Sequence, residues 1–339
     1  MKSISSHAFK ISALIFTLLV LLLIDLKSGS GSYSVKQIIS VLFSENDDTA
    51  LWLNINEFRL PRIFTALIAG IALSVSGLQM QTLFRNPLAG PYILGISSGA
   101  GLGVALVVLG LPGLFAYSVF SSVNNLVLIV SAWLGSAIVM MLIMAVSVRI
   151  KSIMTILVLG IMLGSGISAI ISILQYFSKE AALKAFVVWT MGSLSGVNTD
   201  QIPFLLFGFL AGLIVAVIII KPSNLILLGE DYAKTMGVNI RYYRIWVFLS
   251  TILLTGTVTA FCGPIAFVGI AVPHISRMIS KTTRNGILLS YSILIGASVL
   301  VVSDILSQLP GSDLILPINA VTSIIGIPVV IWIVFRKRT

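Results

Sequence analysis

Charged residues are scarce in this sequence: Asp, Glu, Lys and Arg make up only 9% of its 339 residues. A soluble globular domain carries about 25% charged residues, so the low value excludes an ordinary soluble protein. Hydrophobic residues make up 58% of the chain, and the mean hydropathy is +1.10. Long apolar runs recur from one end to the other, which is typical of an α-helical protein that crosses a membrane many times.

Cysteine and histidine are nearly absent as well. The one cysteine, Cys262, lies in an apolar stretch, and the two histidines, His7 and His274, are far apart. These counts exclude a disulfide framework and a metal cluster of the CxxC type, so we predict no metal and no cofactor bound by this chain. The nucleotide-binding pattern G-x-x-x-x-G-K-[ST] is missing too. We therefore predict no catalytic residue and expect a protein that is not an enzyme.

One short stretch, GISSG at 95–99, matches the G-x-S-x-G pattern of hydrolases. That pattern needs a strand before it, a helix after it, and a histidine and an acid nearby. Here it follows a loop rich in Pro and Gly, so we interpret the match as chance.

Uncharged apolar segments mark the predicted membrane spans. The long uncharged run from 245 to 276 is divided by the breaker CGP at 262–264, and LPG at 111–113 divides another. The fold class that results is an all-α polytopic membrane protein with ten transmembrane helices. They are expected at 11–26, 61–84, 92–111, 125–148, 152–177, 202–220, 245–262, 264–280, 287–303 and 314–335.

The basic residues divide unevenly between the two sides of this ten-span arrangement. If the N-terminus is cytoplasmic, fifteen of the 21 Lys and Arg residues fall in inner segments and the other six in outer ones. This is the asymmetry of the positive-inside rule, and it places both termini in the cytoplasm. The first apolar run is therefore read as a retained helix rather than a signal peptide. The excess of positive charge reflects topology, so we expect no nucleic-acid partner, and residues 1–339 form a single transmembrane domain.

Two charged stretches at or beyond the ends of the spans are candidates for contacts with partners. LLGEDYAKTMGV at 227–238 is the only acidic inner segment, and Leu228, Tyr232 and Met236 recur in it at helical spacing. It either lies flat on the membrane or docks into a cytosolic partner. RLPR at 59–62 puts two arginines at the outer mouth, where they contact either lipid phosphates or carboxylates of an external protein. Asp304 ends the ninth span, and we expect it at the membrane interface.

Several stretches together resemble the FecCD-type permease family, the membrane subunits of ABC importers for ferric siderophores, haem and vitamin B12. They occur in family order over almost the whole chain: RLPR, SGLQMQTLFRNPLAGPYILGISSGAG, LGIMLG, WTMGSLSG, LLGEDYAKTMGV, GPIAFVGIAVPHISR and LPINAVTSIIGIPVVIWIV. The resemblance implies the ABC type II importer permease fold. It also implies two permeases, as identical copies or paralogues, together with two ABC ATPases and an extracytoplasmic substrate-binding protein.

The resemblance also implies roles for particular residues. The cytoplasmic gate would include Asn86 and Leu88, together with Ser152 and Ile153 in the loop from Lys151 to Thr155. A cytoplasmic coupling segment at about 221–243 would seat in the ATPase, and binding-protein docking would use Arg59 and Arg62. Within the coupling segment the matching residues are Gly229, Glu230, Ala233 and Gly237.

Three positions depart from the family pattern. Gln308 stands where members often have an arginine four residues after the acid, and Ile315 and Asn319 replace an acid and a glycine before the last helix. These changes affect the outer mouth rather than the fold.

The sequence thus predicts a permease subunit in the bacterial cytoplasmic (inner) membrane that imports an iron chelate, either a ferric siderophore or haem. The partner ATPase uses the ATP. Vitamin B12 is the alternative cargo. An ion-coupled secondary transporter is the rival class, but it needs acids near the middle of the membrane, and the acids here lie at span ends and in loops.

Overall fold

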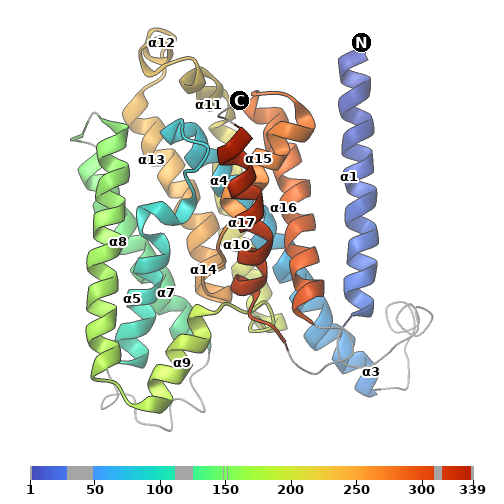
Figure 1. Ribbon diagram of the computed structural model, residues 1–339, viewed down its shortest axis with the longest axis vertical. Helices are drawn as coiled ribbons and strands as arrows, with labels where there is room; N and C mark the ends of the chain where they lie inside the picture. Colours follow the sequence, from blue (N-terminus) through green and yellow to red (C-terminus); the bar gives the residue numbers. More distant parts are fainter. Residues whose placement is uncertain are drawn as a thin grey trace.

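The computed structural model describes residues 2–28, 49–110, 125–147, 149–150, 152–308 and 315–336. Over these ranges the chain forms helices joined by loops, without strands, and the long helices stand side by side (Figure 1). The first half contains α1 (Lys2–Lys27), α3 (Thr49–Leu53), η1 (Asn54–Arg59), α4 (Leu60–Phe84), η2 (Pro91–Leu94), α5 (Ile96–Val108), α7 (Asn125–Ser147) and α8 (Ile153–Tyr176). The second half contains α9 (Glu180–Thr190), η3 (Thr199–Gln201), α10 (Ile202–Ile218), α11 (Ile220–Leu227), α12 (Glu230–Thr235), α13 (Ile240–Thr251), η4 (Ile252–Gly256), α14 (Thr257–Cys262), α15 (Val268–Ser280), α16 (Asn285–Ser307) and α17 (Ile318–Arg336).

Seven helical stretches of the described residues are long and apolar enough to cross a membrane. Two shorter apolar helices, Ile96–Val108 and Ile318–Trp332, accompany them. The prediction of an all-α protein with many membrane helices is therefore confirmed. The seven long stretches are Ser6–Lys27, Ala50–Phe84, Leu126–Ser147, Ile153–Tyr176, Thr199–Ile218, Ile240–Cys262 and Asn285–Ser307.

Some element boundaries differ from the predicted ones. The second predicted span begins at 61, but the helix reaches back through η1 to Thr49, because the charged residues Glu57 and Arg59 lie on a continuous helix instead of ending it. The helix α9 was not expected. Its first turn contains Glu180, and two lysines lie in or next to the helix. It therefore lacks the long uncharged run that identifies a membrane span in the sequence.

The predicted break near CGP is present. α14 ends at Cys262 and α15 begins at Val268, and the connection contains two residues with positive φ, Gly263 (72°) and Phe267 (66°). A Cβ atom on Gly263 would lie 2.5 Å from the carbonyl oxygen of Trp189, so glycine is required here for space as well as for backbone angle. α15 is consequently a short helix of 13 residues.

α4 is the central helix of the bundle, and 83% of its most apolar stretch is buried. It packs against α15 and α16, and at two crossings glycine backbones face each other: Gly70 meets Gly296 of α16, and Gly77 meets Gly269 of α15. A Cβ atom at Gly70 or Gly77 would overlap the partner's carbonyl group. Small residues allow the two helices to approach this closely. In lipid, where the hydrophobic effect does not drive helices together, such close van der Waals packing stabilises their association.

α1 lies at the edge of the bundle (Figure 1), and only 6% of its most apolar stretch is buried. It packs chiefly on α16, where His7 Nδ1 lies 3.1 Å from the hydroxyl of Tyr291 and Lys10 Nζ donates to the carbonyl of Ile279 at 3.0 Å. α1 begins and α17 ends at the same end of the molecule, which also carries α12 (Figure 1). We call this the α12 end, and the opposite end, which carries α3 and α9, the α9 end.

Candidate coupling, gate and docking sites

The predicted coupling segment forms a compact corner at the α12 end (Figure 1). Gly229, with φ 130°, separates α11 from α12, and Gly237, with φ 85°, ends the turn after α12. Both angles lie in the region that favours glycine, which explains why a helix of only six residues has a glycine on each side. Ala233 is fully buried (0% exposed) beneath the corner, so its methyl group faces the protein rather than a partner.

The outward face of this corner is apolar. The side chains of Leu228, Tyr232 and Met236 are 66%, 49% and 57% exposed. Their four-residue spacing, which the sequence showed, therefore forms an exposed stripe at the α12 end. Large exposed apolar patches of this kind mark contacts with another protein or with a membrane surface.

An ion pair fixes the corner to the membrane helices. Glu230 accepts from Arg244 Nη2 of α13 at 3.0 Å, and Arg244 Nη1 also donates to the carbonyl of Ile150 at 3.0 Å. Ile150 lies next to the loop that the sequence assigned to the gate. One arginine therefore connects the coupling corner with that loop, a link that joins residues 94 positions apart and that spacing alone does not reveal.

The two predicted gate loops are ordered by local caps. Asn86 Oδ1 accepts from the backbone N–H of Leu88 at 3.0 Å, and the side chain of Leu88 is 37% exposed. Ser152 is the N-cap of α8 and accepts from the N–H of Thr155, while Ile153 is half-buried. Lys151 lies outside the described residues.

Both gate loops and the coupling corner pack on one set of apolar side chains, which we call the inner cluster. Ala89 from the first loop and Ala233 from α12 are buried in it, and Ile153 packs against it. Of the predicted residues, the structure therefore brings Ile153 of the gate and Ala233 of the coupling segment to one apolar centre. Its buried members are Met80, Leu83, Phe84, Ala89, Leu94, Ile96, Val139, Met140, Ile143, Ile156, Ile219, Ile226, Ala233, Tyr243, Val247, Phe248 and Ile252.

At the α9 end, the two predicted docking arginines make internal contacts. Arg59 is 8% exposed and donates to Asn54 Oδ1 (3.0 Å) and to the carbonyl of Leu26 (2.8 Å). Arg62 forms a two-pronged ion pair with Asp304, in which Nη2 and Nε lie 2.7 and 2.9 Å from the carboxylate. Docking through these two residues stays a prediction.

Asp304 was expected at the membrane interface rather than as a buried acid, but the structure buries it in the protein. It is 0% exposed, because α4 and α16 cross closely enough for Arg62 to reach it and to neutralise its charge. Arg62 also donates to Ser307 Oγ at 3.0 Å. A buried carboxylate is stable in such a position only when paired and hydrogen-bonded in this way.

Of the three departures from the family pattern, Gln308 and Ile315 lie around this pair. Gln308 donates through Nε2 to Asp304 (3.1 Å) and to Asp25 of α1 (2.9 Å), so it joins two carboxylates. Asn319 accepts from the N–H of Ala266 at 3.0 Å and holds the segment between α14 and α15. Ile315 lines a cavity of about 330 Å³ beside the ion pair. The other lining residues are Arg62, Val188, Met191, Gly192, Ser193, Leu194, Ser195, Asp304, Ser307, Leu316, Pro317 and Ile318.

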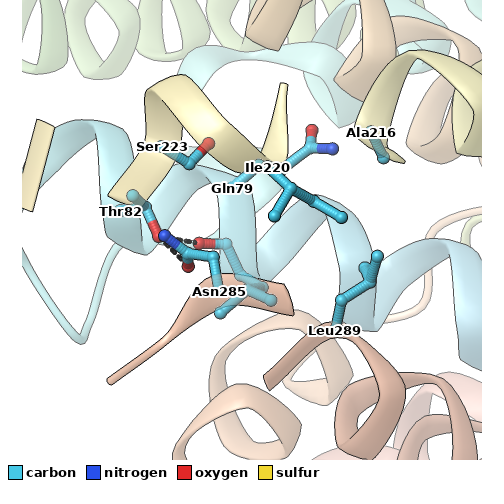
Figure 2. A pocket seen from close by; sticks show the side chains of 8 residues that line it. Gln79, Thr82, Ala216, Ile220, Ser223, Asn285 and Leu289 are labelled. Atoms are coloured by element: carbon cyan, nitrogen blue, oxygen red, sulfur yellow. Dashed lines mark hydrogen bonds between the residues drawn. The ribbon is translucent and has the colours of Figure 1, made fainter. Parts of the chain in front are cut away.

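A second, much smaller cavity lies between α4, α10, α11 and α16 (Figure 2). Its volume is about 20 Å³, space for about one water molecule, which excludes it as a site for a bulky ligand. Figure 2 shows the hydrogen bond of 3.2 Å between Thr82 and Asn285 across one side of it. Ser223 and the buried Gln79 also line it, and sequence reasoning had not pointed to any of these residues.

Taken together, a bundle of apolar helices with a short, solvent-facing helix at one end defines a multi-pass membrane protein. The family model described as the FecCD transport family matches residues 17–336. The chain therefore belongs to the FecCD transport family.

Named relatives and a solved structure match over most of their length. The vitamin B12 import system permease protein BtuC of Escherichia coli O9:H4 (strain HS) is 33% identical over 297 residues, which cover 87% of this chain and 86% of that protein. The hemin transport system permease protein HmuU of Yersinia pestis is 32% identical over 325 residues, 94% of this chain and 95% of that one. A structure described as an inward-facing metal-chelate type ABC transporter aligns with a TM-score of 0.82 at 29% identity, covering 97% of this chain and 99% of that chain.

Proposed function

We propose that this protein is the transmembrane permease subunit of an ABC importer. The observation that carries the proposal is the exposed apolar stripe of Leu228, Tyr232 and Met236, which is tied through Glu230 and Arg244 to the predicted gate loops. Family membership over residues 17–336 supports it. Because the chain lacks a phosphate-binding motif, the energy for transport comes from ATPase subunits that dock at the α12 end.

In this proposal, residues 1–339 form one permease domain with ten crossings, and the α12 end faces the cytoplasm of a bacterium. The seven long spans are joined by α5, α15 and α17 as the remaining crossings, and the common end of α1 and α17 fits an even number. The charge asymmetry of the sequence favours the same orientation. A second permease, as a copy or a paralogue, and an external binding protein complete the importer.

Coupling follows from the contacts at the α12 end. When the ATPases close, they displace α12, and the displacement reaches the gate through two connections. The ion pair between Glu230 and Arg244 pulls on the carbonyl of Ile150, and Ala233 presses on the inner cluster that also holds Ala89. The loops at Asn86 and Ser152 then move together, because both rest on that cluster.

The cargo we propose is an iron chelate, a ferric siderophore or haem. The hemin permease of Yersinia pestis matches 94% of this chain, and the related structure is of the metal-chelate type. Vitamin B12 is the second candidate, favoured by the BtuC relatives at 33% identity. Neither described cavity decides between them, since 330 Å³ is at the low end for a small-molecule site.

The ATPase contact is tested by co-purification. The tagged permease is expressed together with the ABC ATPase subunit of the proposed importer and extracted in mild detergent. The ratio of the two proteins after purification is then measured. Tyr232→Ser should lower ATPase recovery about tenfold, the effect of losing about 1.4 kcal/mol of binding. Tyr242→Ser is the matched control, because Tyr242 is also exposed (63%) but lies on α13 outside the stripe. Equal recovery with both variants would contradict the proposed docking surface.

The cargo is tested by uptake into cells that lack their own permeases of this family. The complete importer is supplied, and accumulation of radiolabelled ferric siderophore, haem and cobalamin is compared. An iron chelate should accumulate in cells with the native importer, which has Glu230. It should fail to accumulate in cells whose ATPase subunit is catalytically inactive. Uptake of cobalamin alone would replace the proposed cargo and leave the importer assignment intact.

A further inference from the structure

Two buried carboxylates share one arginine at the α9 end. Asp25 of α1 is 2% exposed and Asp304 of α16 is 0% exposed. Gln308 Nε2 lies 2.9 Å from Asp25 Oδ1 and 3.1 Å from Asp304 Oδ2, so one nitrogen atom links the two acids. Asp304 also holds Arg62 in the two-pronged ion pair. The group therefore contains two acids and one cation.

Charged side chains of neighbouring helices act on the carboxylate of Asp25. Asp304 on α16 repels its carboxylate, and Arg62 on α4 attracts it. Arg59 on η1 is directed to Asn54 and to the carbonyl of Leu26. Arg62 is thus the cation that the described residues place beside these two acids.

One oxygen atom of Asp25 lacks a hydrogen-bond partner among the described residues. Oδ2 is buried, and within the described ranges it accepts no hydrogen bond. A buried, ionised carboxylate with an unsatisfied oxygen next to a second carboxylate is costly, and two such acids commonly hold a single proton between them. The arginine that often stands at position 308 in the family would add a second positive charge, whereas the amide of Gln308 adds none.

We propose that Asp25 and Asp304 form a proton-binding site, which holds one proton, on Asp25, at neutral pH. A proton from water converts the Asp25 carboxylate into a carboxylic acid, and its O–H gives the pair the donor that the structure lacks. Asp304 keeps its ion pair with Arg62. The bound proton thereby joins the end of α1 to α16 beside the cavity of about 330 Å³.

The proton is observed directly by infrared spectroscopy of the purified full-length protein. A protonated carboxylic acid has a C=O stretch that is separate from the bands of carboxylates and amides and that shifts in D₂O. We expect this band in the native protein at neutral pH and its loss in Asp25→Asn. Asp231→Asn is the matched control, because Asp231 is an exposed acid at the opposite end of the molecule, and the band should remain.

Thermal unfolding gives an independent readout. The folded protein holds a proton that the unfolded chain releases, so Tm should fall as the pH rises from about 6 to about 9. Asp25→Asn, which resembles the protonated form, should remove most of this dependence. Gln308→Arg supplies the missing charge and should remove it as well.

Two results would overturn the proposal. One is a native spectrum without the carboxylic-acid band, or with a band that persists in Asp25→Asn. The other is a Tm that is raised by Na⁺ or K⁺ in the native protein but not in Asp25→Asn, because the site would then hold a metal cation in place of the proton. Neither result bears on the importer assignment, which depends on the α12 end.

Discussion

Two arginine–carboxylate pairs lie at opposite ends of this molecule, in different surroundings. Arg62 and Asp304 join α4 to α16 across 242 residues of sequence, and the side chains are only 13% and 1% exposed. Arg244 and Glu230 join α13 to α12 across 14 residues, and their side chains are 7% and 28% exposed, so the two pairs differ in the carboxylate rather than in the arginine. The first pair has three short contacts, whereas the second has two of 3.0 and 3.3 Å.

The difference indicates different roles for the two pairs: the Arg62–Asp304 pair holds two helices together, whereas the Arg244–Glu230 pair joins helices that can move apart. A buried pair that loses one partner leaves an uncompensated charge, so its elements cannot separate without a large cost. Glu230 can leave its pair at a lower cost than Asp304, because water reaches its carboxylate. The α9 end is therefore built to keep α4 and α16 together, while in the proposed importer the α12 end responds to a docked ATPase.

The largest effect is expected for Arg62→Ala. It leaves Asp304 buried without its cation and should lower the free energy of unfolding by about 3–5 kcal/mol. The measurement is Tm and the yield of monodisperse protein in detergent. The double variant Arg62→Met with Asp304→Leu removes both charges and should recover most of the loss. A single variant as stable as the double would show that the pair is not a scaffold.

The next effect concerns the crossing that lets the first pair form. Gly70 and Gly296 each lie eight residues from Arg62 and Asp304 on the same helices, so their close contact sets the distance between these helices. Gly70→Ala should cost about 1–3 kcal/mol through overpacking. Gly166→Ala on α8 is the control, since no atom lies within 4 Å of its added Cβ, and Tm should stay equal or rise slightly. Equal losses at both glycines would contradict this role of the crossing.

Glu230→Gln should have the opposite profile. Its stability cost is expected to be below about 1 kcal/mol, because the carboxylate is partly solvated. Transport and binding-protein-stimulated ATP hydrolysis by the assembled importer should fall several-fold, because the link to Ile150 is weakened. Comparison of Tm with ATPase rate separates the two effects, and a loss of stability equal to that of Arg62→Ala would remove the contrast between the ends.

The smallest effect is expected for Asp231→Asn. The Lys234 ammonium, 2.8 Å away, holds the pKa of Asp231 below its ordinary value. Because the pKa of Asp231 is lowered, the pair stabilises the folded protein at pH values above the ordinary pKa of an aspartate. This stabilisation is lost as the pH falls and Asp231 is protonated. Both side chains are exposed, so solvent screens the pair, and Tm of the variant should match the native value from about pH 3 to about pH 7. A clear difference in Tm between the native protein and the variant that disappears on acidification would show that this exposed pair is stronger than expected.

The sequence was sufficient to predict the helical class, most spans and a short helix within residues 227–238. Uncharged runs locate spans, and the four-residue spacing of Leu228, Tyr232 and Met236 reveals an exposed stripe. The burial of Asp304 could not be predicted, because its partner lies 242 residues away and only the α4–α16 crossing brings them together. The inward direction of Ala233 also depends on tertiary packing, since its neighbours in the inner cluster come from several helices.

The position of α1 has a consequence for how the chain is made. Its contact residue His7 meets Tyr291, 284 positions later, and Asp25 meets Gln308 across 283 positions. At synthesis rates of about 5–20 residues per second, α1 waits on the order of 15–60 s in the bilayer before α16 emerges. During that interval lipid surrounds the helix, including the carboxyl group of Asp25. A chain interrupted before α16 therefore leaves α1 without its main partner.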